Sequence, residues 1–304
     1  MNWIIVVDKP SGWTSHDVVA KLRGILKEKR IGHGGTLDPM ATGLLPVFIG
    51  SATRAAQFFE NAEKEYIAGL RLGLVTDTQD ITGKIISKSN ASVSAAELDA
   101  VLPRFLGAGQ QIPPMYSALK KDGKKLYELA RRGIDVPRPA RDIYISAIEL
   151  TGGSGDEYTL RVTCSKGTYI RTLCHDIGQA LGCGGVMSSL RRTRAGEFTI
   201  DMAHPLEEIQ RSMQAGDIDE LLLKTDIVFR KYPAAALNEN DTKKCRNGAP
   251  CNNDDLTDGI YRFYGPDDEF IMLGEVISGK IKIIKGFFTD TGASQEKRKV
   301  EPDG

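Results

Sequence analysis

The densest signal in the chain is the segment Gly32-His33-Gly34-Gly35-Thr36-Leu37-Asp38-Pro39-Met40-Ala41-Thr42-Gly43-Leu44-Leu45-Pro46. Glycines around a carboxylate allow the backbone of another molecule to come close, and Pro39 fixes the chain just after Asp38. On physical grounds alone the segment is only suggestive, because Asp followed by Pro commonly forms a structural turn. The glycines should end any regular element and leave His33 on a loop.

The overall composition is that of a globular protein with room for one large domain and a small one. The chain has 304 residues, with Lys plus Arg equal to 40 and Asp plus Glu equal to 40. Net charge therefore neither favours nor excludes a nucleic acid as partner. No apolar run approaches the roughly 20 residues needed to span a bilayer, so we expect a cytoplasmic protein without membrane contact. The cysteines show no zinc-ligand spacing with the histidines, and we interpret them as reduced thiols with no metal site.

The distribution of charge is more informative than its sum. Basic residues gather in two runs, at Lys21, Arg23, Lys27, Lys29 and Arg30 and again at Lys120, Lys121, Lys124, Lys125, Arg131, Arg132, Arg138 and Arg141. A solvated helix face is the ordinary explanation of any one such run. Two runs in one half of a neutral chain indicate a polyanionic partner.

Helices and strands alternate along the first three quarters of the chain. Apolar residues recur at helical spacing after Thr14, which can cap a helix, and Ser94 followed by Glu97 is a capping box that predicts a second helix. Strands are expected at about 66–72, 143–150 and 158–164, and further helices from about Tyr169 to Gly182 and after Pro205.

Three further segments differ in composition from this pattern. The stretch 111–141 is polar, basic and Pro-containing around one short helix, and reads as a projecting insertion. From about Ala234 the pattern changes to short strands with turns, which predicts a small β module with a boundary near Phe229 to Pro233. The last stretch, 290–304, has almost no apolar content and should be disordered.

The segment around Asp38 resembles the nucleophile motif of the TruB family, the bacterial tRNA pseudouridine-55 synthases. Further segments resemble the family's other motifs in the family's order. They are Asp8-Lys9-Pro10, Lys64-Glu65-Tyr66, Thr76-Asp77-Thr78-Gln79-Asp80, Ile112-Pro113-Pro114-Met115-Tyr116-Ser117-Ala118-Leu119-Lys120, Cys164-Ser165-Lys166-Gly167-Thr168-Tyr169-Ile170-Arg171 and Leu190-Arg191-Arg192.

The resemblance implies isomerisation of uridine to pseudouridine at position 55 in the T-loop of tRNA, with Asp38 as nucleophile and no cofactor. Pseudouridine formation breaks the N1 to C1′ bond, rotates the uracil and rejoins it through C5. A carboxylate can hold or stabilise the ribosyl fragment meanwhile, much as in retaining glycosidases. Attack at C1′ and a glycal intermediate both remain open.

The resemblance also assigns roles to other residues. Arg171 would pair with Asp38 through a bidentate fork, where a surface arginine is the ordinary alternative. Tyr66 would lie against the uracil and relay the proton that leaves C5 or C2′, although a tyrosine on an alternating strand is more often a core residue. The remaining substrate-binding assignments are Tyr169 and Leu190 in the base pocket, His33 in the vacated base stack, and Lys9, Asp80, Lys120 and Lys124. Lys9 is equally explained as support for the site or as a strand-end lysine.

These inferences combine into an α/β (α+β) architecture. A catalytic domain over 1–230, with a largely antiparallel mixed sheet and a thumb at about 112–141, precedes a PUA-like β-barrel at 234–286. The expected partner is the T-arm of tRNA, without guide RNA, and the expected state is a monomer. Two alternatives stay open, a non-catalytic tRNA-binding or folding factor and a pseudouridine synthase acting on another RNA.

Overall fold

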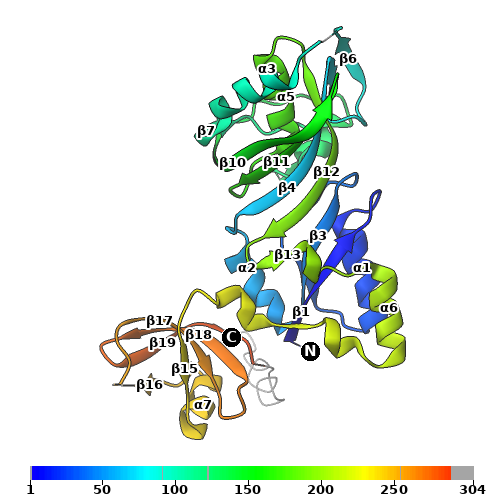
Figure 1. Cartoon of the computed structure of the whole chain (residues 1–304). Helices are drawn as coiled ribbons and strands as arrows, with labels where there is room; N and C mark the ends of the chain where they lie inside the picture. Colours follow the sequence, from blue (N-terminus) through cyan, green and yellow to red (C-terminus); the bar gives the residue numbers. More distant parts are fainter. Residues whose placement is uncertain (1, 91, 122, 254, 289–304) are drawn as a thin grey trace, which may run out of the picture.

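The computed structural model describes residues 2–90, 92–121, 123–253 and 255–288. Figure 1 shows a long sheet flanked by helices and a smaller curled sheet built from the C-terminal part of the chain. The segment 290–304, for which the sequence predicts disorder, lies outside the described residues.

The large sheet is mixed but mostly antiparallel. In spatial order its main path runs through β14 (Leu223–Lys224), β1 (Asn2–Lys9), β3 (Thr42–Gly50), β12 (Gly185–Ala195), β4 (Lys64–Leu72), β11 (Glu157–Cys164), β10 (Arg141–Ser154) and β7 (Gly107–Gln111). Two short strands lie beside this path, β2 (Ile31–His33) next to β3 and β13 (Phe198–Thr199) next to β12. β3 and β12 run parallel, whereas the other described pairs of this sheet are antiparallel. The predicted sheet type is confirmed.

The centre of one half of this sheet is buried on both faces. Ile4 and Val6 of β1 belong to one core cluster, whereas Ile5 and Val7 belong to another. This division follows from the two-residue period of side chains along a strand. It explains why β1 reads as an uninterrupted apolar run in the sequence.

Helices cover the sheet where the capping signals place them. α1 (Ser15–Leu26) begins after Thr14, whose hydroxyl accepts a hydrogen bond from the Asp17 amide at 3.1 Å. α3 (Ala95–Val101) begins with the predicted Ser94–Glu97 capping box. The other α-helices are α2 (Ala56–Phe59), α4 (Leu126–Ala130), α5 (Ile170–Ala180), α6 (Leu206–Ala215) and α7 (Glu239–Arg246). Short 3₁₀ turns occupy Ser51–Ala55, Leu102–Phe105, Ile200–Met202, Ile218–Leu221 and Thr225–Phe229.

The smaller body is a curled five-stranded sheet. Its spatial order is β15 (Ala234–Ala236), β17 (Gly259–Tyr264), β18 (Phe270–Ile277), β19 (Lys280–Gly286) and β16 (Cys251–Asn252). The sequence does not predict α7 beside it, because that segment is almost entirely polar and shows no apolar stripe.

Aromatic side chains join the two bodies. The ring of Phe229, just before the small sheet, lies 5.3 Å from that of Phe58 in α2, measured between centroids. The same ring lies 5.7 Å from Phe270 and 5.4 Å from Phe287 of the small module. The module therefore packs on the large body through a shared apolar cluster, near the N-terminal end of β1 (Figure 1).

One expectation about the central motif is wrong. The sequence predicts His33 on a loop, but it is the last residue of β2 and pairs with Val47 of β3. Gly32 and Gly34 do not end the pairing early, because Gly32 pairs with Phe48 and the Gly34 amide donates to the Pro46 carbonyl at 2.8 Å. Backbone pairing with a long central strand outweighs the flexibility of glycine here.

Candidate active site

Asp38 lies in the connection between β2 and β3, and close packing holds this connection in place. A Cβ on Gly34 would lie 2.7 Å from the Phe59 ring, and one on Gly43 would lie 2.4 Å from the Arg192 carbonyl oxygen. Gly43 also has a φ of +93°, which other residues rarely adopt. Packing at Gly34, and both packing and backbone conformation at Gly43, therefore require glycine near Asp38.

Lys9 also holds the connection between β2 and β3 in place. Its side chain is fully buried, and its Nζ donates to the carbonyls of Pro10 at 2.9 Å, Trp13 at 2.6 Å and Pro39 at 3.2 Å. Burial lowers the pKa of Lys9 to about 8. Because all three donors point to backbone carbonyls, the buried ammonium does not reach a phosphate. Of the two roles that the sequence left open for Lys9, these contacts favour support of the site.

The predicted ion pair between Asp38 and Arg171 is present. Arg171 Nε lies 2.9 Å from Asp38 Oδ2, and its Nη2 lies 3.3 Å from Oδ1, so the guanidinium faces both carboxylate oxygens. The Arg171 side chain is 5% exposed and that of Asp38 is 36% exposed, so the carboxylate stays reachable while its partner is buried. Burial raises the pKa of the Asp38 carboxyl, and the Arg171 charge opposes that rise.

Arg171 is held by two further segments of the chain. Its Nη2 donates to the Tyr116 carbonyl at 2.9 Å, and its Nη1 donates to the Thr78 carbonyl at 3.2 Å. Asp80 Oδ2 lies 3.8 Å from Nη1. The guanidinium therefore connects Asp38 to the loop after β5 (Leu74–Thr76) and to the start of the insertion.

Asp80 is a buried carboxylate that organises its own loop. Its Oδ1 accepts hydrogen bonds from the Thr78 hydroxyl at 2.8 Å and from the Thr82 hydroxyl at 2.6 Å and amide at 3.0 Å. The residue is only 6% exposed. Its position beside Arg171 favours a supporting role over the substrate contact that the sequence predicted.

The motifs assign Tyr66, Tyr169 and Leu190 to the base pocket beside Asp38. Tyr66 and Leu190 belong to one apolar cluster, on the adjacent strands β4 and β12. The charge of Asp38 acts on the phenols of both Tyr66 and Tyr169, and burial raises the pKa of each phenol. Apolar and aromatic side chains near a carboxylate suit a planar base.

Two residues next to the candidate site residues Tyr169 and Tyr66 are not evident from the sequence. Gln111, at the end of β7, holds Tyr169 from both sides, because its amide accepts from the Tyr169 amide at 2.9 Å and donates to the Tyr169 carbonyl at 3.2 Å. Arg192, on β12, is 1% exposed and is the direct cross-strand partner of Tyr66 on β4. Neither has a local signal, because Gln111 begins a polar stretch and Arg192 follows another arginine in an apparently charged strand.

His33 lies at the edge of this region as a neutral imidazole. Its ring meets that of His16 edge-on at 5.3 Å between centroids. Burial, followed by the charges of His16 and Arg192, lowers the pKa of His33 to about 4. The imidazole therefore carries no charge near neutral pH, which suits a side chain that stacks against bases.

The insertion 112–141 begins where β7 ends and finishes where β10 begins, since Gln111 pairs with Arg141. It contains a short hairpin, β8 (Lys120–Lys121) and β9 (Lys124–Lys125), in which Lys120 faces Lys125 and Lys121 faces Lys124. Like charges opposite one another destabilise a hairpin. A surface that collects them in this way favours an anionic partner.

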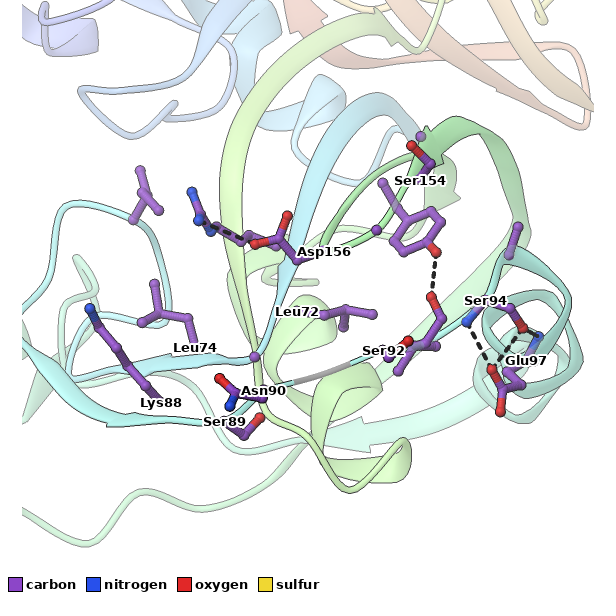
Figure 2. Close-up of a pocket in the computed structure, with 18 of the residues that line it drawn as sticks. Leu72, Leu74, Lys88, Ser89, Asn90, Ser92, Ser94, Glu97, Ser154 and Asp156 are labelled. Carbon is purple, nitrogen blue, oxygen red and sulfur yellow. Dashed lines mark hydrogen bonds and ion pairs between the residues drawn. The ribbon is translucent and has the colours of Figure 1, made fainter.

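A large cavity lies in another part of the molecule than Asp38 and Arg171. It measures about 1170 Å³ and is lined by the end of β4, by β6 (Ile85–Lys88), by the segment leading to α3 and by the β10–β11 turn. Figure 2 shows that several of its polar groups bond to each other, as Ser94 does with Glu97 and Asp156 with Arg71. None of the predicted site residues lines it.

The described residues contain neither a metal cluster nor a membrane-spanning helix. Within 2–90, 92–121, 123–253 and 255–288, no group of three His, Cys, Asp or Glu side chains is placed to bind a metal ion. In the same residues, no helix combines the length and apolar character that a membrane span requires.

Known proteins resemble the chain over most of its length. Residues 23–170 match the TruB family pseudouridylate synthase (N terminal domain), and residues 171–229 match the tRNA pseudouridylate synthase B C-terminal domain. The chain is 42% identical over 292 residues to tRNA pseudouridine synthase B of Azoarcus sp. (strain BH72), covering 96% of this chain and 97% of that protein. It is 44% identical over 256 residues to the protein of the same name from Bacillus cytotoxicus, covering 82% and 83%.

Solved structures share the fold. A Cbf5-Nop10-Gar1 complex contains a chain that superposes with a TM-score of 0.72 at 27% identity, covering 94% of this chain and 85% of that one. An H/ACA RNP bound to a substrate RNA containing 2'-deoxyuridine gives a TM-score of 0.72 at 25% identity, with the same coverage. The predicted α/β fold class is confirmed, and the curled small sheet is consistent with a PUA-like module. On the strength of the full-length relatives and the two adjoining family matches, this chain belongs to the TruB family of pseudouridylate synthases.

Proposed function

We propose that this protein isomerises uridine to pseudouridine at position 55 in the T-loop of tRNA. The observation that carries the proposal is the two-point pairing of Asp38 with Arg171 beside Tyr66. The curated relatives named tRNA pseudouridine synthase B support tRNA as the substrate. Position 55 rests on the motif resemblance.

Asp38 is the nucleophile in this proposal. The N1 to C1′ bond breaks with its electron pair on uracil. The carboxylate then either bonds to C1′, or stabilises the ribosyl fragment while a base takes the C2′ proton to form a glycal and returns it when C5 bonds to C1′. Arg171 keeps the carboxylate ionised against the effect of burial and aims both of its oxygens. Lys9 and Asp80 act indirectly, Lys9 by fixing the backbone at Pro39 and Asp80 by fixing the loop behind Arg171.

The target uridine has to leave its stack before the reaction, at a cost of a few kcal/mol. Tyr66, Tyr169 and Leu190 receive the extruded base, and the neutral His33 fills the space that it vacates. After the uracil rejoins through C5, Tyr66 takes the C5 proton. The C5–H electron pair restores the C5=C6 double bond, and N1 takes a proton from water.

The rest of the proposal concerns organisation. Residues 1–230 form the catalytic domain, with the insertion 112–141 as a thumb that grips the T-arm, and residues 234–286 form an RNA-binding module. The protein works as a cytoplasmic monomer without guide RNA or cofactor. The high identity to proteins named for tRNA supports guide-independent action, although the Cbf5 neighbour belongs to a multi-subunit complex.

The deciding experiment uses an unmodified T-arm stem-loop and maps pseudouridine by carbodiimide-blocked primer extension. Asp38→Asn should abolish product while leaving tRNA affinity within a few fold, because the carboxylate acts on the bond and adds little to docking. Asp156→Asn is the matched control, since it makes the same chemical change in a surface ion pair with Arg71. Turnover of Asp38→Asn within tenfold of wild type contradicts the nucleophile assignment. Binding without product in the wild type would instead indicate a folding factor.

A further inference from the structure

Arg192 is a buried cation that forms no ion pair with a carboxylate in the described part of the chain. It is 1% exposed, its Nε donates to the Leu44 carbonyl at 2.7 Å, and its Nη2 donates to the Gly35 carbonyl at 3.2 Å. A buried charge without a counter-ion costs several kcal/mol, and an apolar residue of similar volume is often more stable.

The surroundings of Arg192 add positive charge. Its guanidinium contributes to lowering the pKa of Lys9, His33 and Lys64, which approach it from β1, β2 and β4. Two backbone carbonyls offset only part of this cost. A nearby group whose ionised form is stabilised by a positive potential would offset the rest of this cost.

Tyr66 is that group by position. Arg192 and Tyr66 are direct partners across the β12–β4 pair, so their side chains project from the same face of the sheet. The charge of Arg192 lowers the pKa of the Tyr66 phenol, against the effect of burial.

We propose that Arg192 is a positioning residue that orients the Tyr66 hydroxyl and stabilises its ionised form, so that Tyr66 can accept a proton from the substrate. The inference rests on the proposed function, because it concerns the proton that leaves C5 or C2′. A neutral phenol cannot accept that proton, whereas a phenolate oxygen beside a guanidinium can. After the transfer, Tyr66 is a neutral phenol on the same face of the sheet as Arg192.

The groups that face Tyr66 support this assignment. Burial raises the pKa of the phenol, and the nearby Cys164 on β11 and Asp38 on the catalytic loop raise it further. The charge of Arg192 opposes all three, and the pKa of the phenol is still above its ordinary value. Loss of the guanidinium should therefore raise this pKa further and lower the fraction of phenolate at any given pH.

The test measures single-turnover rates on the T-arm stem-loop against pH, at saturating full-length enzyme. Arg192→Met should move the midpoint of the rising limb up by at least about one pH unit and lower the rate below that midpoint about tenfold per unit. Arg192→Lys keeps the charge and should keep the midpoint near that of wild type, even if it slows the reaction. Arg191→Met is the matched control, because Arg191 neighbours Arg192 but pairs with Asp8 and is 41% exposed.

A purely structural role predicts a different outcome. If Arg192 only holds the Gly35 and Leu44 carbonyls, the variants lower the rate equally at every pH and leave the midpoint unchanged, which overturns the proposal. Should Arg192→Met fail to fold, the pH profile is measured instead on Arg192→Lys that carries a fluorinated, more acidic tyrosine at position 66. That analogue should shift the midpoint down, and an unmoved midpoint again overturns the proposal. Absence of product from the wild type would instead refute the proposed function.

Discussion

Replacement of Arg171 by lysine keeps the charge beside Asp38 and removes the fork. In the structure, Arg171 reaches Asp38 through two nitrogens, at 2.9 and 3.3 Å, and two backbone carbonyls take two of its three other donors. A lysine has one compact ammonium at the end of a flexible chain, so it can keep one bond to the carboxylate but not the paired geometry.

The expected loss of rate follows from the loss of one of the two bonds to Asp38. One charge-assisted hydrogen bond contributes about 1.5–3 kcal/mol, and each 1.36 kcal/mol of transition-state stabilisation corresponds to a tenfold change in rate. Arg171→Lys should therefore lower the single-turnover rate by about 10- to 150-fold, or more if the carboxylate also turns away. Affinity for tRNA should change little, because the Arg171 side chain is only 5% exposed.

The assay compares single-turnover pseudouridine formation and tRNA binding in the same preparation. Arg161→Lys is the matched control, since Arg161 is half exposed and pairs with Glu149 on the surface. A thermal scan should verify that Arg171→Lys is folded at the assay temperature, because the bonds to Tyr116 and Thr78 are also weakened. A rate for Arg171→Lys equal to that of wild type would refute the pairing role.

Three further predictions address the thumb, the carboxylate and the small module. Lys121 and Lys125 have intramolecular acceptors, Pro137 and Tyr127, whereas Lys120 and Lys124 have none among the described residues. Lys120→Ala with Lys124→Ala should therefore flatten the log–log salt dependence of tRNA binding by roughly 0.7–0.9 for each phosphate that is no longer neutralised, and the Lys121/Lys125 pair should flatten it less. Equal slopes would contradict this division. Because burial raises the pKa of Asp38 above its ordinary 3.8, the rate should fall with decreasing pH through a midpoint above that value, and an acid limb at or below 3.8 would disagree. Truncation after Lys231 should keep stem-loop activity, weaken binding of full-length tRNA and lower Tm, since Phe229 loses the rings of Phe270 and Phe287; a folded but inactive truncated protein would place the module in the active site.

The parts of the fold with local signals were predictable from the sequence. The Thr14 and Ser94 caps lie where a hydroxyl precedes an acidic residue by three positions, and both helices begin there. Strands β4, β10 and β11 follow their apolar alternation, and their observed bounds extend beyond the predicted ones. The order of strands in the sheet has no such signal, because pairing between distant segments depends on the whole core. Helix α7 is not predicted for a related reason, since its polar residues bury only Thr242 and Cys245.

Some features of the active site could also be predicted from the sequence, and others could not. The pairing of Asp38 with Arg171 is predictable only through the motif resemblance, because 133 residues separate them in the chain. The burial of Lys9, Asp80 and Arg192 could not be predicted, since charged residues are placed outside by default and only tertiary contacts show otherwise. The motif resemblance placed Lys9 and Asp80 among the substrate-binding residues, although both are buried.

The balance of buried charge suggests why these residues are arranged as they are. Lys9, Arg171 and Arg192 bring three cations close to the site, whereas Asp38 and Asp80 bring two carboxylates. Backbone carbonyls satisfy most of the cationic donors, which holds the side chains in place without neutralising their charge. These side chains therefore give the site a positive excess in surroundings of low dielectric, where each charge acts more strongly than in water. A nucleotide that enters carries a phosphate and, once its glycosidic bond breaks, a negative charge on uracil. The same excess that makes the folded site costly then stabilises the charges that develop during the reaction.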